Sequence, residues 1–437
     1  MAAPRKLVAD LTSTVREALS SEATQRSTSD SVKMSDHERK ALAMSVLSDG
    51  LKMIDQRQIA ANRARLSKPD ETELIAEVMA AATGLGQVEL LLADPTVEEV
   101  VFPKFDCGFT YHSDGSCRKV DMQWSSDAAL REWLAFLANT KGGTGRSFNA
   151  QHPLLVLQIG EGLRLAATCE VSDHTTFALR RNTMGRVTID DLAARGMYPT
   201  PVGDLLRGLI RAPEMRIVVV GATAAGKTTL VRAMLNELDP YVRVGIVEDT
   251  REIGLRDEFE HPNVESLEVR EANSQGEGEV SMGDLVKQLF RYRVDKLIVG
   301  EVRGSDAAVP MLHAMTNGMS SLTTTHEHTA RGGLEKLSEM LAQGTASTAG
   351  MELGLAKVQV ARAVDIAIHV DRGQGRRFIS EIIEVAGHEG DQILTQQLYA
   401  TDYTGKQTAF NRVSSSVVAD KLRRAGFDEH AARTPSR

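Results

Sequence analysis

One short stretch in the middle of the chain constrains its fold more than any other. Residues 217–235 read IVVVGATAAGKTTLVRAML. Four β-branched residues end at a glycine, a second glycine and a lysine follow at fixed spacing, and the remainder has the apolar pattern of a helix. The stretch therefore predicts a buried strand, a tight loop and a helix in direct succession.

The loop fits the pattern G-x-x-x-x-G-K-[ST], with Gly221, Gly226, Lys227 and Thr228 at the fixed positions. Glycines let successive backbone N–H groups point at one phosphate, and the start of the helix adds its positive dipole end. Lys227 would place a cation against the β- and γ-phosphates. The alternative is a glycine turn with a solvated lysine, but the flanking strand and helix favour the phosphate site.

The phosphate is expected to belong to ATP. No guanine-reading N-K-x-D motif occurs at the strand ends, so ATP is favoured over GTP. Mg²⁺ would accompany it, bound by the hydroxyl of Thr228. The expected nucleotide-binding residues are Gly221, Ala222, Thr223, Ala224, Ala225, Gly226, Lys227, Thr228 and Thr229.

Acidic residues follow two other strand-like runs. GIVEDTREI ends in Glu248, with Asp249 and Glu252 behind it, and KLIVGEVRG supplies Glu301. A third run, SSLTTTHEH, supplies His326. Carboxyl ends of parallel strands meet at one edge of a sheet, so these side chains are expected near the phosphate loop. A helix-capping or turn role remains the alternative for the acids, and a structural role for His326.

The order of strands and helices predicts two domains. After residue 204 the strands and helices alternate, which favours a mostly parallel sheet with helices on both faces. The earlier part reads as a smaller α+β domain. The expected organisation is an N-terminal extension at 1–70, partly disordered and then helical, an α+β domain at 71–195, a Pro- and Gly-rich linker at 196–204, an α/β domain at 205–412, and a polar C-terminal helix and tail at 413–437.

Charge, cysteines and hydropathy exclude several classes of protein. The net charge of -8 argues against a protein that coats nucleic acid, although a local basic patch stays open. Three scattered cysteines provide neither a zinc site nor a disulfide framework. The sequence has no apolar run of the roughly 18–20 residues that cross a membrane and no signal-peptide pattern at its start. We therefore expect a cytoplasmic protein whose membrane contact is peripheral, at the inner face of the cell membrane.

Four segments in order carry a resemblance to a known family. GATAAGKTTL, IVEDTREI, LFRYRVDKLIVGEVRG and SLTTTHEH resemble the Walker A, Asp box, Walker B and His box of the secretion-superfamily ATPases. These enzymes serve type II and type IV secretion, tight-adherence pilus assembly and conjugation. LLADPTVEEVVF and TFALRRN are similar to upstream segments of the same family. The resemblance covers roughly residues 75–390 and implies a RecA-like P-loop ATPase domain.

The resemblance implies roles for single residues. Glu301 corresponds to the Walker B catalytic acid, and Glu301 and Thr228 are both expected beside Mg²⁺. Glu248 corresponds to the Asp-box acid, and His326 corresponds to the His-box residue. Arginines that reach ATP from the N-terminal domain or a neighbouring subunit match Arg180 and Arg181. A solvated strand face is the alternative for this arginine pair.

Some positions depart from the family pattern. Ala222, Ala224 and Ala225 stand where family loops often have other small residues. Alanine is tolerated only where φ is negative, so we expect the loop to bind with normal geometry and slightly less freedom. Gly300 precedes Glu301 where many ATPases have a magnesium-binding Asp, and Met319 takes the place of a family histidine.

The favoured function is an ATP-hydrolysing motor for pilus assembly or protein secretion. The resemblance further implies a homo-hexamer and an inner-membrane platform protein as partner. One alternative is a nucleotide-gated ring scaffold with little turnover, which the departures motivate. Another is a conjugative DNA-transfer ATPase, against which the acidic composition weighs mildly.

Overall fold

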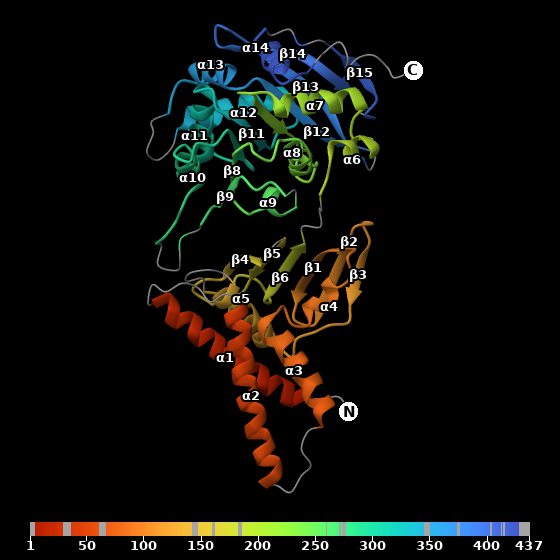
Figure 1. Cartoon of the computed structure of the whole chain (residues 1–437), viewed down its shortest axis with the longest axis vertical. Coiled ribbons are helices and arrows are strands. Elements are labelled where there is room, and N and C mark those ends of the chain that lie inside the picture. Colours follow the sequence, from red (N-terminus) through yellow and green to blue (C-terminus); the bar gives the residue numbers. More distant parts are fainter. Residues whose placement is uncertain are drawn as a thin grey trace. The chain divides into compact units, whose positions relative to one another are not determined.

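The computed structural model describes residues 5–28, 36–60, 67–141, 147–159, 162–181, 186–258, 260–270, 272, 277–344, 350–373, 376–402, 404–411, 413 and 416–427. The chain divides into two compact units, residues 1–183 with 273–277 and residues 184–272 with 278–437. Each unit has its own sheet (Figure 1). Among the described residues, one hydrophobic core lies in the first unit and two lie in the second.

The first unit is an antiparallel sheet with helices. Its strands are β1 (Val97–Lys104), β2 (Cys107–His112), β3 (Cys117–Val120), β4 (Leu154–Ile159), β5 (Leu163–Thr168) and β6 (Thr176–Arg181). They lie in the order β3-β2-β1-β6-β5-β4. The helices are α1 (Arg5–Thr28), α2 (Asp36–Ala60), α3 (Lys68–Thr83), α4 (Val88–Leu92) and α5 (Asp127–Lys141). This is the α+β class that was expected.

Helix α1 lies within residues 1–70, which were expected to form an extension that is partly disordered and then helical. Leu11, Val15 and Leu19 are four residues apart, share one helical face and are buried in the core of the first unit. The helix packs against α2, α3 and α5. Sparse leucines among serines and threonines carry this face, and the polar composition concealed it.

The second unit is built on a nine-stranded sheet. Its strands are β7 (Arg216–Val220), β8 (Val244–Glu248), β9 (Val264–Glu268), β10 (Lys296–Val299), β11 (Ser320–Thr325), β12 (Ile366–Gly373), β13 (Arg376–Glu389), β14 (Gln392–Thr401) and β15 (Gln407–Phe410). The order is β15-β14-β13-β12-β7-β11-β10-β8-β9. The neighbours from β12 to β9 pair parallel, and β12 to β15 pair antiparallel. The predicted mostly parallel sheet is confirmed.

Two cores cover the two faces of this sheet because the strands are apolar on both sides. Ile217 and Val219 of β7 belong to one core, and Val218 and Val220 belong to the other. The first core includes residues of α6 (Ile189–Ala194), α7 (Thr200–Arg211), α8 (Lys227–Leu235), α9 (Leu255–Glu258) and α14 (Ser416–Arg424). The second includes residues of α10 (Met282–Leu289), α11 (Ser305–Thr316), α12 (Ala330–Gln343) and α13 (Leu353–Ala363).

The segment 196–204 does not behave as the predicted linker. Residues from Thr200 onward form the first turn of α7, where Pro201 is well tolerated because that turn needs no N–H donor. Val202 is fully buried. The carbonyl of Met197 accepts a backbone hydrogen bond from Ile379 on β13. The prolines mark a helix start inside the second unit rather than a connection between units.

The C-terminal helix is docked, although it was expected to be polar. Val418 and Leu422 of α14 are buried in the second unit. Lys421 Nζ lies 2.7 Å from the carboxylate of Asp365 and donates to the carbonyl of Glu214 at 2.8 Å. The tail 428–437 lies outside the described residues. In the part of the chain that is described, no helix has the length and apolar character of a membrane span.

Candidate functional site

The loop between β7 and α8 is shaped by two glycines. A Cβ on Gly221 would lie 2.3 Å from the carbonyl oxygen of Val370 on β12, so no side chain fits there. Gly226 has a φ of +103°, in the left-handed region that favours glycine, and it directly precedes α8. The loop thus leads straight into the free amides of a helix N-terminus, an arrangement that favours a bound phosphate.

Ala224 corrects one expectation for this loop. Its φ is +60°, whereas Ala222 and Ala225 are not among the residues with positive φ. The left-handed conformation costs an L-residue roughly 1–2 kcal/mol, because Cβ approaches the following carbonyl oxygen. The loop therefore holds backbone strain at one of its three alanines.

Lys227 is almost fully buried, and its ammonium group is held by its own loop. Nζ donates to the carbonyl oxygens of Gly221 at 2.9 Å and Ala222 at 3.0 Å, and it lies 3.2 Å from Nδ1 of His326. Burial lowers the pKa of Lys227, and the negative charge of Glu301 opposes that effect. A phosphate in the loop would offer the ammonium group stronger acceptors than these carbonyls.

Sheet order places the strand-end residues side by side. β7, β11, β10 and β8 are consecutive parallel neighbours. Val220 pairs with Thr325, and Val299 pairs with Val247. The chain continues from these pairs into the glycine loop, His326, Gly300 and Glu248, so these groups lie at one edge. The expected juxtaposition is present.

A series of side-chain contacts runs from the loop across this edge. His326 lies between Lys227 and Glu301, with Nδ1 toward the ammonium group and Nε2 against Oε1 of the carboxylate. Oε2 of Glu301 accepts from Nε of Arg303 at 2.7 Å. Nη1 of Arg303 lies 3.4 Å from Oδ2 of Asp249. Positive and negative groups alternate along this series, with the neutral ring of His326 between Lys227 and Glu301. This order is electrostatically favourable.

This arrangement assigns the tautomer of His326. The ammonium group of Lys227 has only donors, so Nδ1 is the acceptor and the proton sits on Nε2, facing Glu301. Burial and the charge of Lys227 lower the pKa of His326, which keeps the ring neutral. His326 thereby connects the phosphate-loop lysine to the strand-end carboxylate.

Glu248 is buried and only partly hydrogen-bonded. Oε1 accepts from the N–H groups of Glu252 and Ile253, each at 3.0 Å, whereas Oε2 has no hydrogen-bond partner among the described residues. Burial raises the pKa of Glu248 to about 7. A Cβ on Gly300 would lie 3.0 Å from Cγ of Glu248. The carboxylate side chain on β8 thus lies against the position where many ATPases have an Asp.

Three buried threonines fix the strand ends. The hydroxyls of Thr323, Thr324 and Thr325 donate to the carbonyls of Val299, Gly300 and Val302 at 2.8, 2.8 and 3.1 Å. They bond β11 to β10 and to the residues that flank Glu301. The sequence motif contains these threonines but does not reveal their role, because that role depends on the pairing of β11 with β10.

Arg180 and Arg181 lie on β6 of the first unit. The side chain of Arg180 is exposed, whereas Arg181 donates to the carbonyls of Leu92 and Asp94. Arg181 therefore holds the segment before β1 within its own unit. The assignment of this arginine pair to ATP stays a prediction.

Two further arginines were missed. Arg303 follows Glu301 by two residues, so its proximity to that acid was available from spacing. Arg377 on β13 lies beside the loop, since a Cβ on Gly226 would be 3.2 Å from its Cδ. Arg377 is 150 positions from Lys227 in the sequence, and no local pattern signals the approach.

The sequence is similar to proteins described for secretion and for conjugal transfer. The sequence model of the family described as "Type II/IV secretion system protein" matches residues 159–423. A protein of Mycobacterium tuberculosis, named provisionally for conjugal transfer, is 30% identical over 332 residues, covering 73% of this chain and 90% of that protein. The type IV secretion system protein VirB11 of Brucella suis is 28% identical over 258 residues, covering 52% of this chain and 69% of VirB11.

Solved structures give a weaker likeness. The Brucella suis VirB11 ATPase in complex with sulphate has 22% sequence identity and a TM-score of 0.36, covering 68% of this chain and 95% of that one. The pilus retraction motor PilT with bound ADP has 14% identity and a TM-score of 0.49, covering 78% of this chain and 87% of that one.

Proposed function

Because the chain belongs to the type II/IV secretion system protein family, we propose that it is an ATP-hydrolysing motor that powers pilus assembly or protein secretion through a membrane machine. The observation that carries the proposal is the contact series from Lys227 through His326 to Glu301. A phosphate-binding lysine and a candidate base for water are connected through one histidine ring.

The residues at the loop fit ATP and Mg²⁺. Gly226 and the N-terminus of α8 offer backbone amides to the phosphates, and Lys227 can exchange loop carbonyls for phosphate oxygens. Thr228 and Glu301 are the predicted metal-side residues, and the free buried oxygen of Glu248 adds a carboxylate at the same edge. Bound Mg²⁺ would neutralise charge on the β- and γ-phosphate oxygens.

Four residues would share the work of hydrolysis. Glu301 accepts the proton of the attacking water, the contact between Nε2 of His326 and Oε1 positions the carboxylate, and Arg303 offsets its charge from the other side. Lys227 stabilises the charge that develops on the transferred phosphoryl group. Binding of a phosphate to Lys227 would change its contact with His326, and this change would alter the position of Glu301.

The direct test is Glu301→Gln, which keeps the shape of the side chain and removes its basicity. We expect ATP turnover to fall by roughly 10²–10⁴-fold, because a positioned base contributes about that much, while the affinity for ATP stays within a few-fold. The matched control is Glu335→Gln on the exposed side of α12, where turnover should not change. Unchanged turnover in Glu301→Gln would exclude Glu301 as the base.

The same experiment separates the motor from a ring scaffold. A scaffold would bind ATP, but the ATP turnover of its wild-type form would already be close to that of Glu301→Gln. A wild-type rate well above that of Glu301→Gln is expected only of a motor.

A conjugative DNA-transfer ATPase is the second candidate, favoured by the name of the Mycobacterium tuberculosis relative. It predicts turnover that rises with single-stranded DNA and loses this stimulation steeply as salt increases. Turnover that is indifferent to DNA between low and moderate salt would favour pilus assembly or protein secretion.

The assembly and its location belong to the same proposal. We propose a homo-hexamer in the cytoplasm, at the inner face of the cell membrane, acting on an inner-membrane platform protein. Analytical ultracentrifugation with and without a non-hydrolysable ATP analogue tests the assembly.

A further inference from the structure

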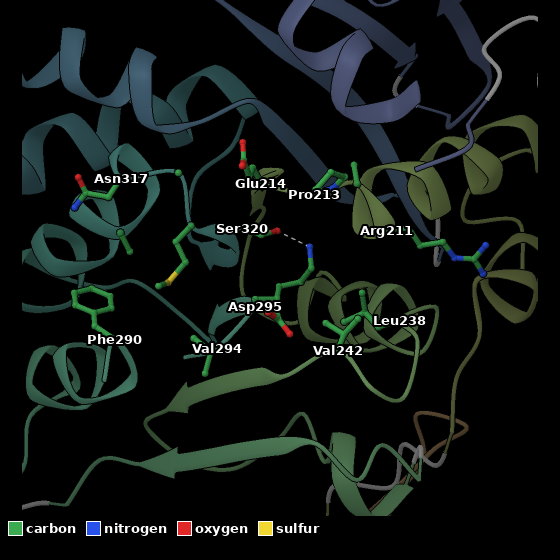
Figure 2. A pocket seen from close by; sticks show the side chains of 15 residues that line it. Arg211, Pro213, Glu214, Leu238, Val242, Phe290, Val294, Asp295, Asn317 and Ser320 are labelled. Carbon is green, nitrogen blue, oxygen red and sulfur yellow. Dashed lines mark hydrogen bonds between the residues drawn. The ribbon is translucent and has the colours of Figure 1, made fainter. Parts of the chain in front are cut away.

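A cavity of about 730 Å³ opens at the edge of the second unit where β10 and β11 begin. The cavity lies at the opposite end of these strands from the candidate nucleotide site. Lys296 is the first residue of β10 and Glu301 follows its last residue, a separation of roughly 16 Å along an extended chain. The lining residues come from the ends of several elements and include Glu214, Val242, Phe290, Val294, Asp295 and Lys296 (Figure 2).

Lys296 is a buried lysine on the wall of this cavity. The residue is 4% exposed, and Nζ donates to the hydroxyl oxygen of Ser320 at 2.6 Å. The hydroxyl of Ser320 in turn donates to the carbonyl of Met215 at 3.0 Å. Because this hydroxyl is neutral, it does not balance the charge of an ammonium group. Two of the three N–H groups of Lys296 have no hydrogen-bond acceptor among the described residues.

No described carboxylate compensates the charge of Lys296. Asp295 is adjacent in sequence, but its Oδ2 accepts the backbone N–H of Arg243 at 2.9 Å, and Glu214 forms no ion pair with Lys296. Burial alone lowers the pKa of Lys296 to about 7. A charged lysine inside a protein without an anion is unfavourable, so an anion that enters the cavity would pair with Lys296 and stabilise its ammonium form.

The rest of the wall is largely apolar. In the view of Figure 2, Phe290 and Val294 lie on one side of Ser320, and Leu238 and Val242 lie on the other. Phe290 is 40% exposed, so part of its ring is accessible from the cavity side. The volume is typical of sites for small organic molecules, which combine apolar walls with a few fixed polar groups.

We propose that this cavity binds a small amphiphilic anion, whose carboxylate, sulfonate or phosphate group pairs with Nζ of Lys296 and whose apolar body packs against Val242, Val294 and Phe290. The ligand leaves the nucleotide loop free, since the two sites lie at opposite ends of β10 and β11. The proposal rests on the cavity and the uncompensated lysine and does not depend on ATP hydrolysis.

The test compares two probes that share one apolar body. 8-Anilino-1-naphthalenesulfonate carries the anion, and N-phenyl-1-naphthylamine is its neutral counterpart. We expect the wild-type full chain to bind the sulfonate at one site, and Lys296→Met to weaken that binding roughly ten- to hundredfold, the usual effect of losing a charged hydrogen bond. Binding of the neutral probe should stay within about threefold.

Three further variants locate the site. Lys296→Arg keeps the charge and should retain the sulfonate within a few-fold, whereas Lys287→Met removes an exposed lysine of α10 and should change nothing. Val242→Trp narrows the cavity without altering Lys296 and should reduce binding of both probes. This last variant keeps the proposal testable if Lys296→Met does not fold.

Two outcomes would overturn the proposal. One is equal affinity of the sulfonate for wild type and Lys296→Met. The other is undiminished binding of both probes to Val242→Trp, which would place them elsewhere on the protein.

Discussion

The backbone strain of the loop between β7 and α8 lies at Ala224. Its φ of +60° leaves strain that glycine would not have. We expect Ala224→Gly to stabilise the nucleotide-free protein by about 1 kcal/mol, a gain partly offset by the freedom of glycine in the unfolded chain. The thermal unfolding midpoint of the second unit is the measurement.

The matched control for that prediction is Ala222→Gly, two positions earlier in the same loop. Ala222 is exposed and does not have positive φ, so glycine brings only added freedom to the unfolded chain and should destabilise. A loss of stability in both variants would mean that Ala224 is not strained.

Glu248 predicts a pH dependence of stability. Its pKa is raised to about 7 in the folded chain, above the ordinary value of 4.5. The folded state therefore holds this proton more tightly than the unfolded state does. The stabilising contribution is complete below about 4.5 and is lost as the pH rises through about 7, by up to roughly 3 kcal/mol.

Replacing Glu248 by glutamine isolates this contribution, because the amide is neutral at every pH. The difference in unfolding free energy between Glu248→Gln and wild type should shift in favour of the variant as pH rises from 5 to 8. Urea denaturation without nucleotide measures it. Glu335→Gln, on the exposed side of α12, should show no such trend, and a pH-independent difference for Glu248→Gln would contradict the buried carboxyl.

At the scale of elements, β6 presents two adjacent arginines with different surroundings. Arg181 donates to two carbonyls of the segment before β1, whereas Arg180 is exposed. We expect Arg181→Ala to destabilise the first unit by roughly 1–2 kcal/mol, since two hydrogen bonds from a charged group are lost. Arg180→Ala should leave stability within about 0.5 kcal/mol.

Activity then separates the structural role from the predicted role at ATP. If Arg180 acts at ATP, Arg180→Ala lowers turnover at unchanged stability, and Arg180→Lys restores only part of it because lysine lacks the planar fork. Wild-type turnover by Arg180→Ala would remove Arg180 from the candidate catalytic residues.

The elements also show what the sequence could and could not predict. The strand, glycine loop and helix around Lys227 follow from local spacing, and the shared edge of Glu301 and His326 follows from the rule for parallel strands. Arg377 could not be predicted, because only the pairing of β13 with β12 brings it to the loop. The prolines near residue 200 were misread, since a linker and the first turn of a helix both favour proline.

At the scale of the whole molecule, the sheet carries two distinct edges. The ends of β7, β8, β10 and β11 hold the candidate nucleotide site, and the starts of β10 and β11 border the cavity with Lys296. The first edge is encoded in short contiguous motifs, so it could be predicted from the sequence. The cavity depends on loops separated by many residues, so it emerged only from the folded chain.

The proposed ring makes a prediction that no single subunit could. If turnover in one subunit depends on its neighbours, mixing wild type with Glu301→Gln must lower activity faster than the wild-type fraction falls. In a ring of six coupled subunits, one inactive subunit also lowers the ATP turnover of its neighbours. Mixtures should be co-assembled at constant total protein and assayed for phosphate release, with Glu335→Gln mixtures as the reference of unchanged activity. A strictly linear decline with Glu301→Gln would show that the subunits hydrolyse ATP independently, and the motor would then have to work without coordination around a ring.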